Sequence, residues 1–133
     1  MATDGLISIK SNHGPKETMD RLVAEVQAKG LTVCARIDHA AGASDAGLAL
    51  RPTELVIFGN ARGGTPLMQP NQSIGIDLPL KALVWQDASG STWVSYNDPA
   101  WLVQRHGLGH EVDAPVKAMT ALLGAVTQAA TAA

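Results

Sequence analysis

The residues best suited to chemistry in this chain lie in one run, from Arg51 to Lys81. An apolar segment in this run ends at Gly59-Asn60 and continues into Gly63-Gly64-Thr65. Glycine lets the backbone approach a ligand or another segment closely, and amide N–H groups in such a turn can bind an anion. The pattern predicts either a ligand-binding loop or a tight turn that needs left-handed glycines. It contains no G-x-x-x-x-G-K-[ST] phosphate loop.

Three further positions carry groups that could bind or transfer a proton. His39 ends an alternating segment, so it could act as acid/base or simply bond to backbone at a strand end. Asp77 and Lys81 flank Leu78-Pro79-Leu80, where Asp77 could cap a turn and Lys81 could hold a carboxylate. Tyr96 could point into a pocket or into the core. The predicted ligand-binding residues are His39, Asn60, Gly63, Gly64, Thr65, Asp77, Lys81 and Tyr96.

Other reactive residue types give weaker patterns. His106 and His110 are four residues apart, but Gly107 and Gly109 disfavour the continuous helix that would bring their side chains together, so no metal site is predicted. Cys34 falls on the opposite face of its strand from His39, which argues against a cysteine–histidine pair. The sequence contains no cofactor fingerprint, and the cofactor is left unknown.

Composition limits the class of protein. The chain has 133 residues, is 46% hydrophobic and 17% charged, and has a net charge of −2. We expect a single domain over 1–133 with frayed ends at about 1–4 and 128–133. The ten basic residues are scattered, which argues against nucleic-acid binding and against a polybasic membrane site. No apolar run approaches the roughly 20 residues that span a bilayer. One cysteine fits a reducing cytoplasm, although a removed signal peptide would leave no trace.

The elements that position these residues follow from periodicity. Alternation predicts strands over 6–10, 31–39, 53–60, 81–87 and 91–97, with Val33, Ala35 and Ile37 on the same face as His39. A helix is predicted from Pro15 to 29, a second over 99–107 and a third from about 113. Residues 61–79 read as irregular, with a short helical turn near 66–71. Strands in succession with few helices predict an α+β domain with an antiparallel sheet.

Four segments together resemble the family called domain of unknown function 302. They are LRPTELVIFGN (50–60), GGTPLM (63–68), IGIDLPLKALVW (74–85) and VSYNDPAWLVQRHGL (94–108), and the likeness extends over about 5–125. The resemblance implies a two-layer β-α-β4-α fold with helices on one face, similar in outline to TATA-binding-protein-like folds, and it implies dimers. It implies no established activity. The family pattern often has proline after Gly-Asn, where this chain has Ala61.

Three functions are consistent with these patterns. The first is a cytoplasmic, homodimeric small-ligand-binding domain, with its pocket between the 59–68 loop, the strand end at His39 and the Asp77–Lys81 corner. The second is an enzyme in the same pocket, with His39 as acid/base and Thr65 and the loop amides stabilising an anion. The third is a structural or interaction module whose Gly/Pro run only shapes a dimer.

Overall fold

A computed structural model describes residues 3–133 of the chain and shows one five-stranded antiparallel sheet with helices. The strand order is β1-β5-β4-β3-β2. The strands are β1 (Leu6–Lys10), β2 (Thr32–Asp38), β3 (Thr53–Gly59), β4 (Leu80–Gln86) and β5 (Thr92–Asn97). The helices are α1 (Pro15–Ala28), α2 (His39–Asp45), α3 (Ala61–Met68), α4 (Pro99–Arg105) and α5 (Asp113–Thr131), with 3-10 turns η1 (Gln72–Asp77) and η2 (His110–Val112).

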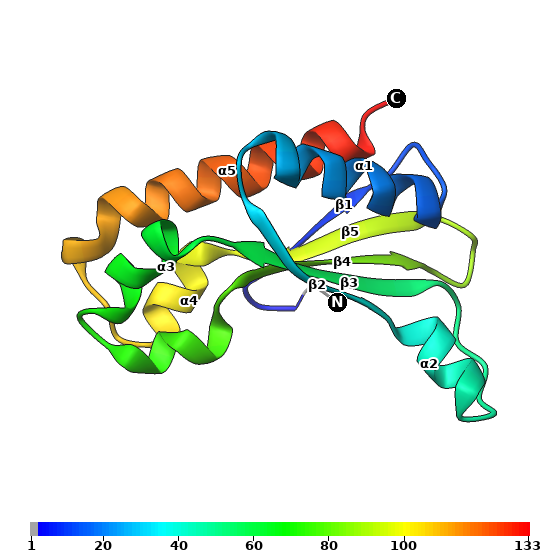
Figure 1. The fold of residues 1–133 in the computed structure, drawn as a ribbon, viewed down its shortest axis with the longest axis horizontal. Helices are drawn as coiled ribbons and strands as arrows, with labels where there is room; N and C mark the ends of the chain where they lie inside the picture. Colours follow the sequence, from blue (N-terminus) through cyan, green and yellow to red (C-terminus); the bar gives the residue numbers. More distant parts are fainter. Residues whose placement is uncertain (1–2) are drawn as a thin grey trace.

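The two long helices, α1 and α5, lie side by side on one face of the sheet (Figure 1). Helix α1 begins with Pro15 at its first turn and buries Met19, Leu22 and Val26, which recur at helical spacing. These side chains meet a row of buried strand residues that includes Val56 and Phe58. The predicted α+β class, with an antiparallel sheet and helices on one face, is confirmed.

The end of α5 is held in place by the first part of the chain. Asn12 Nδ2 donates to the carbonyl of Thr131 at 3.0 Å, and the Arg21 guanidinium donates to carbonyls near the helix end, among them that of Ala129 at 2.9 Å. These bonds satisfy carbonyls that a helix end leaves unpaired. Helix α5 therefore runs to Thr131, past residue 128, from which fraying is expected. The expected fraying at 1–4 falls partly on residues 1–2, which lie outside the described residues.

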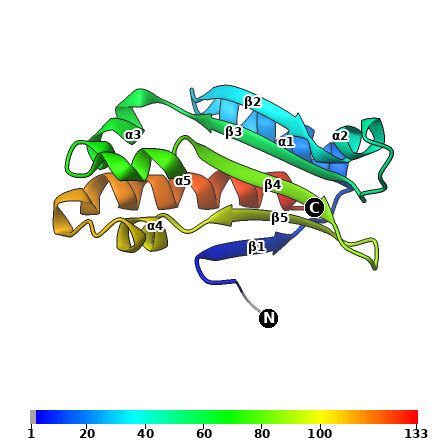
Figure 2. The ribbon, with the colours of Figure 1, turned by 90° about the horizontal axis from the view of Figure 1, so that it is seen from below.

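The opposite face of the sheet has no helical layer over it in the described part of the chain (Figure 2). Its side chains come from alternate positions of paired strands, with Leu55 opposite Leu83 and Trp85 opposite Trp93. The two indoles are stacked with ring centroids 6.3 Å apart. A broad apolar surface is therefore open on this side.

A bulge at Cys34 changes which residues of β2 face the helices. Val33 pairs with Phe58, and Ala35 pairs with the next residue back, Ile57, so Cys34 is the extra residue. Val33 therefore faces the core, whereas Ala35 lies on the open face beside Ile57. The predicted single face for Val33, Ala35, Ile37 and His39 is wrong for this reason, because simple alternation assumes an unbroken ladder.

Candidate functional site

A cavity of about 690 Å³ opens at the end of the sheet where β2 begins and β3 ends. Helix α3, the η1 turn and the first half of α5 form its other walls. It is lined by Leu31, Thr32, Cys34, Gly59, Asn60, Ala61, Arg62, Gly63, Gly64, Thr65, Met68, Gly75, Leu78, Pro79, Leu80, Pro115, Ala118, Met119 and Leu122. Its size is within the range of pockets that hold small organic ligands.

The 59–68 segment of this wall is mainly a helix, α3, and not the irregular loop that the sequence predicts. Asn60 begins it as N-cap, and its Oδ1 accepts a hydrogen bond from the Gly63 amide at 2.7 Å. Leu67 is buried, so tertiary packing supports a sequence of low helix propensity. The tight-turn alternative required left-handed glycines, but neither Gly63 nor Gly64 has a positive φ. That alternative is wrong.

Two glycines beside the cavity allow neighbouring side chains to lie close to the backbone. A Cβ built on Gly64 would lie 3.7 Å from a Leu78 methyl and 3.8 Å from the Met68 Cε, both of which line the cavity. A Cβ on Gly75 would lie 3.2 Å from the Met68 sulfur. The absence of side chains at Gly64 and Gly75 therefore keeps open part of the space that Met68 and Leu78 border.

The lining is mostly aliphatic and carries one charged residue. Leu31, Leu78 and Met119 are among the apolar side chains, while Asn60, Thr65 and Cys34 add polar atoms. Arg62 is the charged member, and no aspartate or glutamate lines the cavity. The Arg62 guanidinium is exposed and has no ion-pair or hydrogen-bond partner among residues 3–133. Such a cavity can take up an apolar body and offer a cation and neutral polar atoms at its rim.

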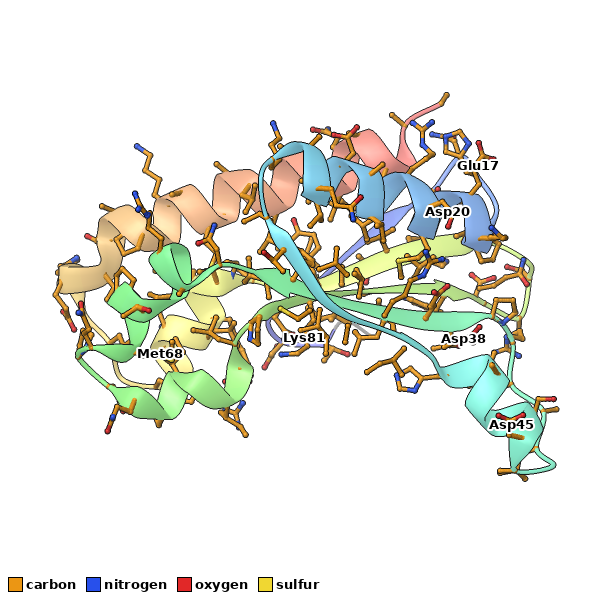
Figure 3. All side chains as sticks on the ribbon, viewed as in Figure 1. Glu17, Asp20, Asp38, Asp45, Met68 and Lys81 are labelled. Carbon is orange, nitrogen blue, oxygen red and sulfur yellow. The ribbon has the colours of Figure 1, made fainter. Side chains whose placement is uncertain are left out.

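The structure brings only some of the predicted site residues together. Asn60, Gly63, Gly64 and Thr65 line the cavity. His39 does not, because it is the exposed first residue of α2, at the other end of β2. Figure 3 shows this separation, since Asp38, the residue before His39, lies at the opposite end of the sheet from Met68. The predicted convergence of His39 with the 59–68 segment is therefore not found.

The remaining predicted residues support the fold beside the cavity. Lys81 Nζ donates to the carbonyls of Pro79 at 3.2 Å and Asp77 at 3.4 Å, and so ties the corner that precedes β4. Tyr96 is buried in the core and does not line the cavity. The Asp77 carboxylate accepts hydrogen bonds from Arg105, the last residue of α4. This corner still reaches the cavity indirectly, because Leu78 and Pro79 form part of its wall.

Sequence reasoning missed a polar cluster around His106, defined here as the corner cluster: Ser73, Asp77, Arg105 and His106. His106 Nε2 lies 2.5 Å from Asp77 Oδ2, and its Nδ1 lies 2.8 Å from Ser73 Oγ. Arg105 Nη1 donates to both Asp77 carboxylate oxygens at 3.0 Å. The side chains of His106 and Asp77 are 8% and 14% exposed. The cluster joins α4 to η1, and no local motif marks a pair 29 residues apart in sequence.

The other histidines lie elsewhere. His110 is fully exposed and its Nδ1 is 3.0 Å from Asp113 Oδ2, so it does not meet His106. Among the described residues, no group of three or more His, Cys, Asp or Glu side chains is placed to hold a metal ion.

Two carboxylates and one guanidinium far from the cavity have shifted pKa values with clear causes. Hydrogen bonds from Trp93, Ser89 and the Ser91 amide lower the pKa of Asp87 to about 2, which fixes the β4–β5 turn. On the helix face, hydrogen bonds from Lys16 and then Arg36 lower the pKa of Asp20. Glu54 raises the pKa of Arg36 through their hydrogen bond. These groups connect elements of the fold.

The order of strands and the helical layer define an open-faced, two-layer α+β domain, and comparison with known proteins gives its family. The family model described as "Domain of unknown function DUF302" matches residues 7–126, so the chain belongs to that family. A solved structure of an uncharacterised conserved protein of this family from Bacillus stearothermophilus superposes with a TM-score of 0.84 at 19% identity. The match covers 96% of this chain and 99% of that one, and it shows the fold.

Curated relatives are longer than this chain. It is 51% identical over 124 residues to proteins named fluoride-specific ion channel FluC 1 from Brucella suis and Brucella abortus. The match covers 93% of this chain but 49% and 46% of those proteins. The chain therefore spans about half the length of the curated relatives it matches. Within residues 3–133, none of the helices combines the length and apolar character needed to cross a membrane.

Proposed function

We propose that the chain is a cytoplasmic small-ligand-binding domain whose ligand occupies the cavity beside α3. The observation that carries this proposal is a 690 Å³ space with an aliphatic lining and a few polar groups at its rim. Asn60 and Thr65 contribute polar contacts. Gly63 and Gly64 allow the ligand to approach the backbone closely, but their amides already donate to Asn60. A cytoplasmic location is consistent with the exposed, unpaired Cys34 thiol, which a reducing compartment preserves.

Asp77 and Lys81 have an indirect role in this proposal. Lys81 and the corner cluster fix the backbone on either side of Leu78 and Pro79, and these two residues shape the cavity. Tyr96 contributes to the core under the same site. The alternative is an enzyme that uses His39 as acid/base in this cavity. It has no geometric support, because His39 follows the end of β2 whereas the cavity opens where β2 begins.

Filling the cavity tests the proposal. Gly64→Leu places a side chain between Met68 and Leu78 in a helix whose backbone tolerates it. Gly42→Leu is the matched control, because Gly42 is also helical, lies in α2, and a Cβ there would meet nothing within 4 Å. Native mass spectrometry of gently purified protein and titration with the neutral dye Nile red measure endogenous and added ligand.

We expect the wild type and Gly42→Leu to bind Nile red alike, and Gly64→Leu to bind it at least tenfold more weakly while remaining folded by circular dichroism. Any extra mass found on the wild type should be absent from Gly64→Leu. Equal dye binding by all three proteins would place the dye elsewhere, for example on the open sheet face. That result, or no dye binding by the wild type, would contradict the proposal.

The open sheet face supports a second proposal, that two copies pair through it. Its apolar part is formed by Leu55, Ile57, Leu83, Trp85 and Trp93, and Lys10 and Lys81 border it. Five strands about 4.8 Å apart and about 20 Å long present roughly 500 Å² per copy, so a pair would cover about 1,000 Å². That area reaches the lower range of specific interfaces. Apolar sheet faces pack about 10 Å apart in sandwiches, which gives this arrangement a precedent in geometry.

Leu83→Lys tests this pairing because it puts a charge at the centre of the face. We expect a dimer for the wild type and for the control Ala121→Lys, which lies exposed on α5, and a monomer for Leu83→Lys. Light scattering after size exclusion gives the mass of each. A wild-type monomer at 100 micromolar, or a dimer that persists in Leu83→Lys, would exclude pairing through this face.

The named activity of the Brucella relatives suggests fluoride as a ligand, and the cavity chemistry argues against it. A small, strongly hydrated anion needs several donors to replace its water, and this lining is mostly aliphatic. We propose that this domain contributes ligand binding, and not ion conduction, to the longer relatives. Sodium fluoride should then leave Nile red binding unchanged at equal ionic strength, whereas competitive loss of the dye would favour fluoride as the ligand.

A further inference from the structure

We infer that the cavity selects an anionic amphiphile, a molecule with an apolar body and a single carboxylate-like head that meets Arg62. The inference rests on the proposed ligand-binding function and adds the chemical class of the ligand. It arises from an asymmetry in the lining. Apolar side chains form the walls, and the one charged residue is a cation at the rim.

The lining carries a net positive charge because Arg62 is its one charged residue. No acidic residue lines the cavity, and Asp77, which precedes the lining residue Leu78, is already bound by Arg105 and His106. A ligand carboxylate can therefore accept from a guanidinium that has no competing partner among the described residues. A cationic head would meet Arg62 without any compensating anion.

The neutral polar atoms do not supply the same selectivity. Asn60 Oδ1 is occupied by the Gly63 amide, and the Thr65 hydroxyl can either donate or accept. These groups can form hydrogen bonds with neutral and with anionic head groups. Discrimination by head-group charge is therefore assigned to Arg62.

The walls set the preference for the body. Met68, Leu78, Met119 and Leu122 are among the flexible apolar side chains of the lining, and methionine in particular adapts to the shape of a ligand. Burial of each methylene in such an environment raises affinity by about fourfold. Affinity should rise with chain length until the cavity is filled, and then level off.

Cys34 provides a direct report on occupancy. It is the only cysteine of the chain, it lines the cavity, and its thiol is exposed. A ligand in the cavity should slow its alkylation by a maleimide. The probes are decanoate, decanol and decylammonium, which share one body and differ in head-group charge, each used below its critical micelle concentration. The chain is tested as wild type, as Arg62→Gln, and as the control Arg51→Gln, whose arginine lies outside the lining.

For the wild type and Arg51→Gln we expect decanoate to protect Cys34 at about threefold to fivefold lower concentration than decanol, the size typical of a rim ion pair. Decylammonium should protect least. In Arg62→Gln the difference between decanoate and decanol should disappear, with decanol unchanged. This pattern would support the inference.

Three other results would overturn it in different ways. Equal protection by all three probes, lost in Gly64→Leu, would keep the ligand-binding cavity and reject the anionic class. No protection by any probe, together with no Nile red binding, would reject the ligand-binding function itself. A preference for decanoate that survives in Arg62→Gln would reject the role of Arg62.

Discussion

Two polar regions lie at the same end of the molecule and differ in how their polar groups are used. In the corner cluster, Asp77 and His106 each have partners on two sides and are largely buried. At the cavity rim, Arg62 is exposed and has no partner among the described residues. Polar groups that are satisfied within the protein stabilise it, whereas unpaired groups beside an apolar space are free to bind something else. The comparison separates residues that hold the site from residues that meet a ligand.

The largest expected effect is on stability, from His106→Ala. The change removes a nearly buried ring and leaves Asp77 and Ser73 without their shared partner, which should lower the free energy of unfolding by about 2 kcal/mol. His110→Ala is the matched control, since that ring is fully exposed and its loss should cost less than about 0.5 kcal/mol. Urea denaturation measures both. If both variants lost the same small amount of unfolding free energy, the corner cluster would stabilise the fold no more than the exposed His110 does.

A smaller effect is expected at the rim, on binding alone. Thr65→Ala removes a hydroxyl that lines the cavity, so decanoate affinity should fall by roughly threefold to fivefold while the free energy of unfolding changes by less than about 0.5 kcal/mol. Thr120→Ala is the control, because Thr120 lies on the exposed side of α5 and its hydroxyl bonds to the Val116 carbonyl. Calorimetric titration and urea denaturation together test this. A change in stability without a change in affinity would show that Thr65 supports the fold and does not contact the ligand.

Local patterns in the sequence predicted the elements, and partners distant in sequence decided the rest. The spacing of Met19, Leu22 and Val26 was enough for α1, and alternation located the five strands. The bulge at Cys34 could not be predicted, because it depends on how Val33 and Ala35 pair with β3. A ladder with one extra residue reverses the faces that follow it.

The candidate site shows the same division. The composition of the 59–65 segment marked a wall of the cavity, but Gly-Gly-Thr-Pro reads as a loop and forms a helix because Asn60 caps it and Leu67 is buried. The sequence pattern groups His39 with this wall because both follow strand ends. In an antiparallel sheet, β2 and β3 end on opposite sides, and that arrangement separates them. The corner cluster needed contacts between η1 and α4, which no local pattern encodes.

The smallest expected effect extends the comparison to the β4–β5 turn, where Asp87 is another satisfied carboxylate. Its pKa of about 2 is below the usual value because Trp93, Ser89 and Ser91 donate to it in the folded state. A depressed folded-state pKa stabilises the protein above the unfolded pKa, near 3.8, and that contribution is lost as pH falls toward 2. Asp87→Asn should therefore lower the melting temperature slightly at pH 6 and flatten its decline between pH 4 and pH 2. Ser89→Ala, which removes one of the donors and keeps the carboxylate, should depart less from the wild-type acid slope. If both variants kept that slope, the hydrogen bonds to Asp87 would not contribute to stability. The turn would then resemble the cavity rim, where polar groups do not stabilise the fold.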